Sequence, residues 1–395
     1  MESVLTETRI FNPRDLNEEY ANTGMSIEEY QELYRKSIED RDGFWDEQAK
    51  LIDWFKPYDK VWEKTDLFPG KWFVGGKLNV CYNCIDRHVK AGKGDKVAII
   101  WEADEPEQIR KYTYNELLNE VSKVANGMKK LGLKKGDRVT IWLPMIPELA
   151  IIMLACTRLG IIHSIVFGGF SKEAVKDRSQ DSNSRLLFTS DETVRAGKFY
   201  PKMADVVKII DKIPTIEKVI IVKRSGNEIP HTKRDIWYSD FIANVSENCE
   251  CEEMDSEDTL FILYTSGTTG KPKGVKHTTG GYILYTSFSH RIVFNYKEGD
   301  IWYCTADIGW ITGHSYIVYG PLANGATTLM FEGVPTYPDV DRFWQICEDH
   351  KVTQFYTAPT AIRAIMRFGD EPVKRHDLSS LKLLGTVGEP INPEA

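Results

Sequence analysis

The segment from Tyr264 to His277 contains the residues best suited to chemistry. Its sequence is YTSGTTGKPKGVKH, and it directly follows an apolar run at 260–264. Glycines let a backbone come close to an anion, hydroxyl groups donate hydrogen bonds, and lysines add positive charge. Residues of these three kinds are Gly267, Gly270, Gly274, Ser266, Thr268, Thr269, Lys271 and Lys273. The segment therefore predicts a loop that holds phosphate.

This loop differs from the Walker A motif. The order G-x-x-x-x-G-K-[ST] is absent, because no Ser or Thr follows Lys271 to hold magnesium in that manner. A flexible Gly-Thr surface loop is the alternative interpretation. The density of phosphate-compatible residues directly after a strand favours the phosphate site.

Alternating helices and strands are expected to position this loop. Thr113 and Glu116 form a capping box that begins a helix ending at Gly132. A strand at 138–143, a helix beginning at Pro147 and a β-branched strand at 161–167 then make a β-α-β unit. We expect further helices near 172–178 and 202–211, and strands at 186–189, 219–222, 260–264, 301–305, 327–331, 354–356 and 381–386. This alternation predicts an α/β fold of two doubly wound, mostly parallel subdomains.

Three regions are expected along the chain. Residues 1–100 form an amino-terminal helical and aromatic-rich wrap, which includes a helix capped by Ser26. Residues 101–257 form a first α/β subdomain. Residues 258–395 form a second one with the phosphate loop, and the polar stretch 224–258 joins the two.

Composition limits the possible partners. The 395 residues are 42% hydrophobic and 27% charged, as in ordinary globular proteins, and the net charge of -8 argues against nucleic acid and anionic membranes as partners. The longest apolar stretch, 149–167, is interrupted by Arg158 and His163, which favours a buried segment over a membrane span. The first residues do not resemble a secretory signal. A cytoplasmic or nucleocytosolic location is expected.

Seven scattered cysteines do not suggest a disulfide framework. Cys81 and Cys84 form a C-x-x-C motif, but no second pair stands at zinc-knuckle distance. A structural or redox role is possible for such a motif, and plain packing is the interpretation that we prefer.

At the phosphate loop the chain resembles the adenylate-forming superfamily of acyl-CoA synthetases, peptide-synthetase adenylation domains and luciferases. Further segments narrow this resemblance to the acetyl-CoA synthetase branch, and it extends from about Ser26 to the last residue. These segments are LNVCYNCIDRH at 78–88, VFGGF at 166–170, ADIGWITGHSY at 306–316, YTAPTAIR at 356–363 and GTVGEP at 385–390.

The resemblance implies a two-step reaction. A carboxylate attacks the α-phosphate of magnesium ATP to give acyl-AMP and pyrophosphate, and the coenzyme A thiol then displaces AMP. Acetate is the acid implied. An enzyme for propionate or another short acid stays open, because one methylene in an apolar pocket changes binding by only about 1 to 3 kcal/mol. A catalytically silent nucleotide-binding protein is the other alternative.

Matching motifs also imply residue roles. Thr265 to Lys273 would hold the β- and γ-phosphates, with Thr265, Thr268 and Lys273 as catalytic residues. The nucleotide contacts would be Gly388, Glu389 and Pro390. The acyl pocket would be Trp310, Ile311, Thr312 and Val387. The coenzyme A contacts would be Gly168, Gly169, Arg195, Lys198, Thr312, Thr336 and Ala358. No metal ligand is implied in this chain, and His277 and His314 are interpreted as structural because a carboxylate substrate is already ionised.

Each of these roles has a plainer alternative. A Gly-Glu-Pro sequence is an ordinary turn, and Trp310 and Ile311 are of types more often found in a core. Lys198 stands where bacterial members usually have arginine, so a bidentate phosphate contact becomes a point charge. Thr336 replaces an expected asparagine. Arg195 and Lys198 also suit a solvated helix face.

The family continues well beyond Ala395. We expect the ribose-binding aspartate, a tryptophan that closes the acyl pocket and the mobile carboxy-terminal lid domain to be absent from this chain. The 395 residues alone are therefore expected to bind nucleotide weakly and not to turn over.

Overall fold

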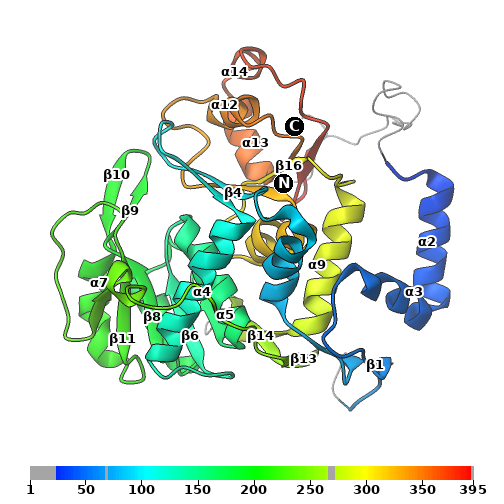
Figure 1. The fold of residues 1–395 in the computed structure, drawn as a ribbon. Coiled ribbons are helices and arrows are strands. Elements are labelled where there is room, and N and C mark those ends of the chain that lie inside the picture. Colours follow the sequence, from blue (N-terminus) through cyan, green and yellow to red (C-terminus); the bar gives the residue numbers. More distant parts are fainter. Residues whose placement is uncertain (1–23, 67–69, 266–271, 393–395) are drawn as a thin grey trace.

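The computed structural model describes residues 24–66, 70–265 and 272–392 (Figure 1). Two large β-sheets with helices packed on them form the body of the molecule. The first sheet has the strand order β12-β11-β8-β6-β7-β14-β15. Its strands are parallel except for the antiparallel pair β14 and β15. The bounds are β6 (Arg138–Trp142), β7 (Ile162–Ile165), β8 (Leu186–Ser190), β11 (Lys218–Val222), β12 (Asp235–Trp237), β14 (Thr259–Thr265) and β15 (Lys273–Thr278).

The second sheet has the strand order β19-β18-β16-β17-β4-β5. Its strands are parallel except for the antiparallel pair β4 and β5. The bounds are β4 (Val97–Glu102), β5 (Ile109–Thr113), β16 (Ile301–Cys304), β17 (Thr327–Phe331), β18 (Gln354–Thr357) and β19 (Leu383–Thr386). The expected α/β architecture with two mostly parallel sheets is confirmed.

Small two-stranded sheets complete the β-structure. They are β1 (Lys60–Glu63) with β2 (Lys71–Val74), β3 (Lys77–Leu78) with β13 (Met254–Asp255), and the hairpin of β9 (Glu192–Arg195) and β10 (Lys198–Pro201). This last hairpin projects from the edge of the molecule (Figure 1).

Most of the helices lie between or beside the sheets. The longer ones are α2 (Ile27–Glu39), α3 (Arg41–Gln48), α4 (Tyr114–Lys130), α5 (Pro147–Leu159), α6 (Lys172–Asp181), α7 (Lys202–Ile209), α9 (Thr279–Val293), α12 (Arg342–Asp349) and α13 (Pro359–Met366). The shorter ones are α8 (Tyr238–Phe241), α10 (Ile311–Gly313), α11 (Gly320–Ala323) and α14 (Glu371–Lys374). The 3-10 and π-helical segments are η2 (Ala49–Leu51), η3 (Tyr82–Asp86), η4 (Val89–Lys93), η5 (Ile210–Lys212) and η6 (His314–Tyr319).

Helix starts follow their local signals. Ser26 and Glu29 form the expected capping box of α2, and Thr113 and Glu116 form that of α4. Pro147 is the first residue of α5, where its missing N–H costs nothing. These signals act within one turn, so the sequence is sufficient to predict them.

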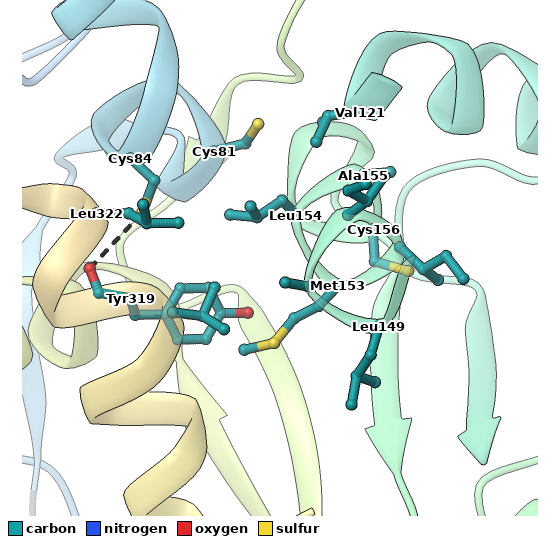
Figure 2. Close-up of a cluster of buried hydrophobic side chains, with 14 of the residues drawn as sticks. Cys81, Cys84, Val121, Leu149, Met153, Leu154, Ala155, Cys156, Tyr319 and Leu322 are labelled. Atoms are coloured by element: carbon teal, nitrogen blue, oxygen red, sulfur yellow. Dashed lines mark hydrogen bonds between the residues drawn. The ribbon is translucent and has the colours of Figure 1, made fainter. Parts of the chain in front are cut away.

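Helix α5 lies in the middle of the main core. Its side chains pack between Val121 of α4 on one side and Tyr319 and Leu322 on the other (Figure 2). Nearly every residue of this helix is buried. The apolar stretch 149–167 is thus the buried α5 and β7 that its sequence predicts. None of the described helices combines the length and apolarity needed to cross a membrane.

The strands do not follow the expected division into 1–100, 101–257 and 258–395. Strands β4 and β5 belong to the second sheet, where β4 pairs with β17, although most of β4 lies in the expected amino-terminal wrap. Strands β14 and β15 close the first sheet, since β14 pairs with β7. Hydrogen bonding between strands distant in sequence decides this arrangement, and periodicity along the chain contains no information about it.

Candidate functional site

The predicted phosphate loop joins β14 to β15. Thr265 pairs with Lys273 at the end of this antiparallel hairpin, and both residues are exposed. The Tyr264 hydroxyl donates to the Asp181 carboxylate at 2.6 Å and so ties the end of β14 to α6. Ser266, Gly267, Thr268, Thr269, Gly270 and Lys271 lie outside the described residues. The structure therefore describes the residues on both sides of the loop. As predicted, a strand, β14, precedes the loop in the sequence.

The carboxyl ends of three neighbouring strands of the second sheet meet beside one another. The Thr305 and Thr357 hydroxyl oxygens, after β16 and at the end of β18, lie 2.6 Å apart. The N–H of Val387, just after β19, donates to the Thr357 carbonyl at 3.1 Å. This brings Ala358 and Val387, two predicted site residues, to one edge of the sheet. In open α/β sheets such an edge is where ligands bind.

The Gly-Glu-Pro turn lies against the start of α13 at the same edge. Glu389 accepts the N–H of Thr360 at 2.9 Å and forms an ion pair with Arg363. Gly388 has φ of 95°, a conformation that glycine adopts without strain. Desolvation raises the pKa of the Glu389 carboxyl, but hydrogen bonds from Arg363 and Thr360 outweigh it and lower that pKa. The turn of Gly388 and Glu389, which we call the Glu389 corner, is therefore fixed against α13 and carries a negative charge.

Trp310 packs on the loop that contains Gly168 and Gly169. Its ring centroid lies 5.8 Å from that of Phe167 and 5.7 Å from that of Phe170. The Trp310 side chain is 46% exposed and that of Ile311 is 40% exposed, while Thr312 is half-buried. The predicted wall of the acyl pocket and the predicted glycines of the coenzyme A site are therefore neighbours, and Trp310 keeps an open face.

Arg195 and Lys198 face each other across the tip of the β9–β10 hairpin rather than on a helix. Ala196 and Gly197 make the turn, with φ of 50° and 70°. The buried Asp104 carboxylate accepts both of their backbone N–H groups, at 3.0 and 2.7 Å. Such charge-assisted bonds are about twice as strong as neutral ones. The hairpin tip, with its two cations, is thus anchored to the end of β4.

Thr336 lies near the hairpin tip, because the next residue, Tyr337, is close to Gly197. The Tyr337 hydroxyl donates to Glu105 at 2.7 Å. A Cβ atom added at Gly197 would lie 2.6 Å from that hydroxyl. The segment containing Thr336 therefore packs against the hairpin tip.

Asp307 lies in the Trp310 turn, where the charge of the hairpin residue Arg195 acts on it. Its carboxylate accepts the N–H of Gly309 at 2.6 Å. Burial raises the pKa of Asp307 to about 6, although the Gly309 N–H and the charges of Arg195 and Lys202 act in the opposite direction. The Asp307 carboxylate, which the sequence analysis did not select, therefore holds the Trp310 turn and interacts with the charge of Arg195.

Lys202 is a second residue that the sequence analysis did not select. Its ammonium donates to the Gly168 carbonyl and lies 3.8 Å from the centre of the Trp142 ring. Burial lowers the pKa of this lysine to about 8. A lone lysine after a proline carries no motif, so only the fold reveals that it supports the glycine loop.

His277 and His314 belong to an aromatic stack. The His314 ring lies 4.5 Å from Phe261 and 5.8 Å from His163, and its Nδ1 lies 3.1 Å from the Trp310 carbonyl. Burial lowers the pKa of His314 to about 4 and also lowers that of His277. Their surroundings favour neutral packed rings, in keeping with the structural role expected for both.

Two family models together match most of the chain. Residues 85–395 match the family model of AMP-binding enzymes, and residues 30–84 match that of the acetyl-coenzyme A synthetase N-terminus. The chain belongs to the AMP-binding enzyme family.

Its relatives narrow the comparison to one kind of enzyme. An acetyl-coenzyme A synthetase of Syntrophus aciditrophicus is 58% identical over 371 residues, which cover 93% of this chain and 57% of the relative. That of Halorhodospira halophila is 53% identical, with 99% and 61% covered. Acetyl-coenzyme A synthetase 2 of Pseudomonas aeruginosa is 56% identical, with 94% and 58% covered. The chain thus spans about three-fifths of the length of these relatives.

Proposed function

We propose that this chain takes part in the ATP-dependent activation of acetate. The reaction converts acetate and ATP to acetyl-AMP and pyrophosphate, and then transfers the acetyl group to coenzyme A with release of AMP. The observation that supports it most is the edge where β16, β18 and β19 end. There Val387, Ala358 and the Glu389 corner adjoin one another. We choose acetate as the acid substrate because the relatives are named acetyl-coenzyme A synthetases.

In the first step the chain's task is to stabilise charge on phosphoryl oxygens. Acetate is already ionised near neutral pH, so no general base is required. Donors aimed at the phosphate oxygens then account for most of the rate enhancement. Lys273 and Thr265 lie opposite each other at the hairpin end, where they would hold the β- and γ-phosphates together with the loop between them.

Trp310 and Val387 would form apolar walls around the methyl group of acetate. Ile311 would add apolar surface, and the Thr312 hydroxyl would hydrogen-bond the carboxylate or thioester oxygen. Each additional methylene in an apolar pocket changes binding by about 1 to 3 kcal/mol. We therefore expect a moderate preference for acetate over propionate.

In the second step coenzyme A would enter along the glycine loop. Gly168 and Gly169 have no side chains to block a pantetheine arm, and Lys202 holds their loop by the Gly168 carbonyl. Arg195 and Lys198 at the hairpin tip would meet the phosphates of the coenzyme. Lys198 offers a single point charge where arginine would offer a planar pair of donors.

Magnesium would bind as a complex with ATP and not at a separate site made of protein ligands alone. Among the residues that the structure describes, the one group of three possible metal ligands is Cys81, Asp86 and Cys251. Thiolates suit soft metals, whereas magnesium takes oxygen ligands and is commonly held by nucleotide phosphates. The described residues therefore do not fit a resident magnesium site, and no step is assigned to one.

The partners proposed are the small molecules acetate, ATP and coenzyme A. A cytoplasmic compartment, or the nucleus and cytoplasm together, would supply all three. The seven cysteines are unpaired, which suits a reducing compartment.

Acetate-dependent exchange of pyrophosphate into ATP tests the proposal. We would measure it with this chain alone and with the chain extended by the carboxy-terminal part of the Syntrophus aciditrophicus relative. Acetate should support the fastest exchange, ahead of propionate and butyrate. Lys273→Ala should slow it about a hundredfold, because a phosphate contact is lost. Lys276→Ala, also exposed on β15, should leave it unchanged.

Exchange with propionate faster than with acetate would transfer the proposal to that acid. Absence of exchange with all three acids, in both forms of the protein, would refute an adenylating activity. A folded, inactive chain that still binds AMP would then be a nucleotide-binding protein.

A further inference from the structure

Two cysteines distant in sequence meet around a buried ion pair. Ligand atoms of Cys81, Asp86 and Cys251 all lie within 4.8 Å of one another. Arg158 donates to both oxygens of Asp86, at 2.8 and 2.9 Å. The same guanidinium approaches the Cys81 sulfur at 3.4 Å. A positive charge beside a sulfur stabilises its thiolate, which is the reactive form of cysteine.

The partner of Cys81 is not the one that the C-x-x-C motif suggests. Cys84 is fully buried, and its thiol donates to the Tyr319 carbonyl at 3.8 Å. Cys81 and Cys84 point in different directions from their helix (Figure 2). The sulfur of Cys251, 170 positions further along the chain, is the one placed near Cys81.

Hydrogen bonds to the backbone of its neighbours hold Cys251 in this position. Arg158 donates from Nε to the Cys249 carbonyl at 2.5 Å, and its own carbonyl accepts the N–H of Glu252 at 2.8 Å. The Asn79 amide donates to the Glu252 carbonyl at 2.9 Å. The segment on both sides of Cys251 is therefore fixed, so the approach of the two sulfurs is a built feature of the fold.

The arrangement suits thiol chemistry better than metal binding. Both Asp86 oxygens are already bonded to the guanidinium of Arg158. A divalent cation between the two sulfurs would also lie beside that fixed positive charge, which repels it. A thiolate, in contrast, is attracted to the same charge.

We propose that Cys81 and Cys251 form an oxidation site at which hydrogen peroxide, or another small hydroperoxide, makes a disulfide bond. Cys251 is half-buried and Cys81 fully buried, so the reagent meets Cys251 first. The Cys251 thiolate attacks one peroxide oxygen, the O–O bond breaks, and a sulfenic acid and hydroxide form. The Cys81 thiolate then attacks the Cys251 sulfur and expels the second oxygen as hydroxide. The two thiol protons convert both hydroxides to water, so two thiols and one peroxide give one disulfide and two waters.

The Cys251 thiol is expected to react slowly with peroxide at neutral pH. The pKa of the Cys251 thiol is raised, first by its contact with the Cys81 sulfur and then by burial, while Arg158 acts in the opposite direction. Asp86 also raises it. Cys251 therefore holds its proton, and the attack on peroxide needs either excess peroxide or raised pH. The oxidation is therefore expected to be slow unless one of these conditions is met.

The test uses the complete 395-residue chain, treated with excess hydrogen peroxide, alkylated and digested with trypsin. Mass spectrometry should find the peptide containing Cys81 linked to the peptide containing Cys251, with two hydrogens fewer than the two peptides together. Dithiothreitol should separate them. Cys84 shares the first peptide and Cys249 the second, since no lysine or arginine intervenes. Variants must therefore locate the bond.

Cys84→Ser and Cys249→Ser should each keep the link, and Cys251→Ser should abolish it. Cys347→Ser, in a separate core cluster, serves as the matched control and should also keep it. A bond that disappears in Cys84→Ser or Cys249→Ser instead would overturn the proposal. So would a wild-type chain in which Cys251 is oxidised to sulfinic acid while Cys81 stays free. Absence of any link between these two peptides in the peroxide-treated wild-type chain would also overturn the proposal, and this outcome can be observed even where a variant fails to fold. It does not depend on the activity proposed above.

Discussion

The carboxylate of Asp104 accepts the backbone N–H of Gly197 at 2.7 Å. This bond joins the end of the second sheet to the tip of a hairpin that belongs to the other half of the molecule. Asp104 is fully buried, so its charge is directed to the hairpin and not to solvent. The two cations beside this turn, Arg195 and Lys198, depend on it for their position.

Asp104→Asn should weaken coenzyme A binding about tenfold, because an amide cannot accept two backbone N–H groups with the strength of a carboxylate. AMP binding should not change, since the Glu389 corner lies elsewhere. Calorimetric titration of both ligands measures the two effects. Glu107→Gln, an exposed neighbour, is the control. Equal loss of both affinities would indicate general damage to the fold instead.

Lys202→Met should loosen the glycine loop, because the Gly168 carbonyl loses its donor and the Trp142 ring loses the ammonium over its face, while the methionine side chain still fills the space. We expect faster hydrogen exchange at the amides of 168–170 and weaker binding of coenzyme A. Lys208→Met, exposed on the same helix, should change neither. Unchanged exchange in the Lys202 variant would contradict a supporting role.

Gly309→Ala should separate Trp310 from its neighbours. The new Cβ atom would lie 2.6 Å from the Cα atom of Phe167, a contact that requires the backbone to move. Overpacking of this kind costs about 1 to 3 kcal/mol, which denaturant unfolding measures. Gly281→Ala is a suitable control, because its Cβ would meet the nearest atom, in Trp72, at an ordinary 3.8 Å. Equal stability of the two variants would contradict the prediction.

The titration of Glu332 should make the protein less stable as the pH rises toward about 8. Burial raises the pKa of this carboxyl from 4.5 to about 8, in opposition to its ion pair with Arg224. A group whose pKa is raised by folding contributes stability below its unfolded value, and this contribution is lost as pH rises through the folded value. The free energy of unfolding should therefore decrease between about pH 5 and about pH 8.

Glu332→Gln should flatten that decrease, because the amide does not titrate. Denaturant unfolding at several pH values compares the variant with wild type and with Glu28→Gln on exposed α2. If the free energy of unfolding decreased as steeply in the Glu332 variant, other groups would be responsible for the loss of stability.

The sequence alone determined the features that depend on near neighbours. Capping boxes at Ser26 and Thr113 act over three residues, and the alternation from Arg138 to Val222 follows from the spacing of apolar side chains. The phosphate loop was predicted from consecutive glycines, hydroxyls and lysines, and its role in binding phosphate stays a prediction. Its placement after a strand required only the apolar run before it.

Only the tertiary structure decided which distant segments meet. The C-x-x-C motif places Cys84 three residues after Cys81, but the sulfur that lies near Cys81 is that of Cys251, because packing around Arg158 brings it there. Nor does any motif mark Asp104 or Lys202, which act through backbone atoms far along the chain. The physical reason is that almost any residue can offer its backbone N–H or carbonyl group to a hydrogen bond. The type of the partner residue therefore does not reveal the contact in the sequence. Such contacts exist once the sheets have been assembled.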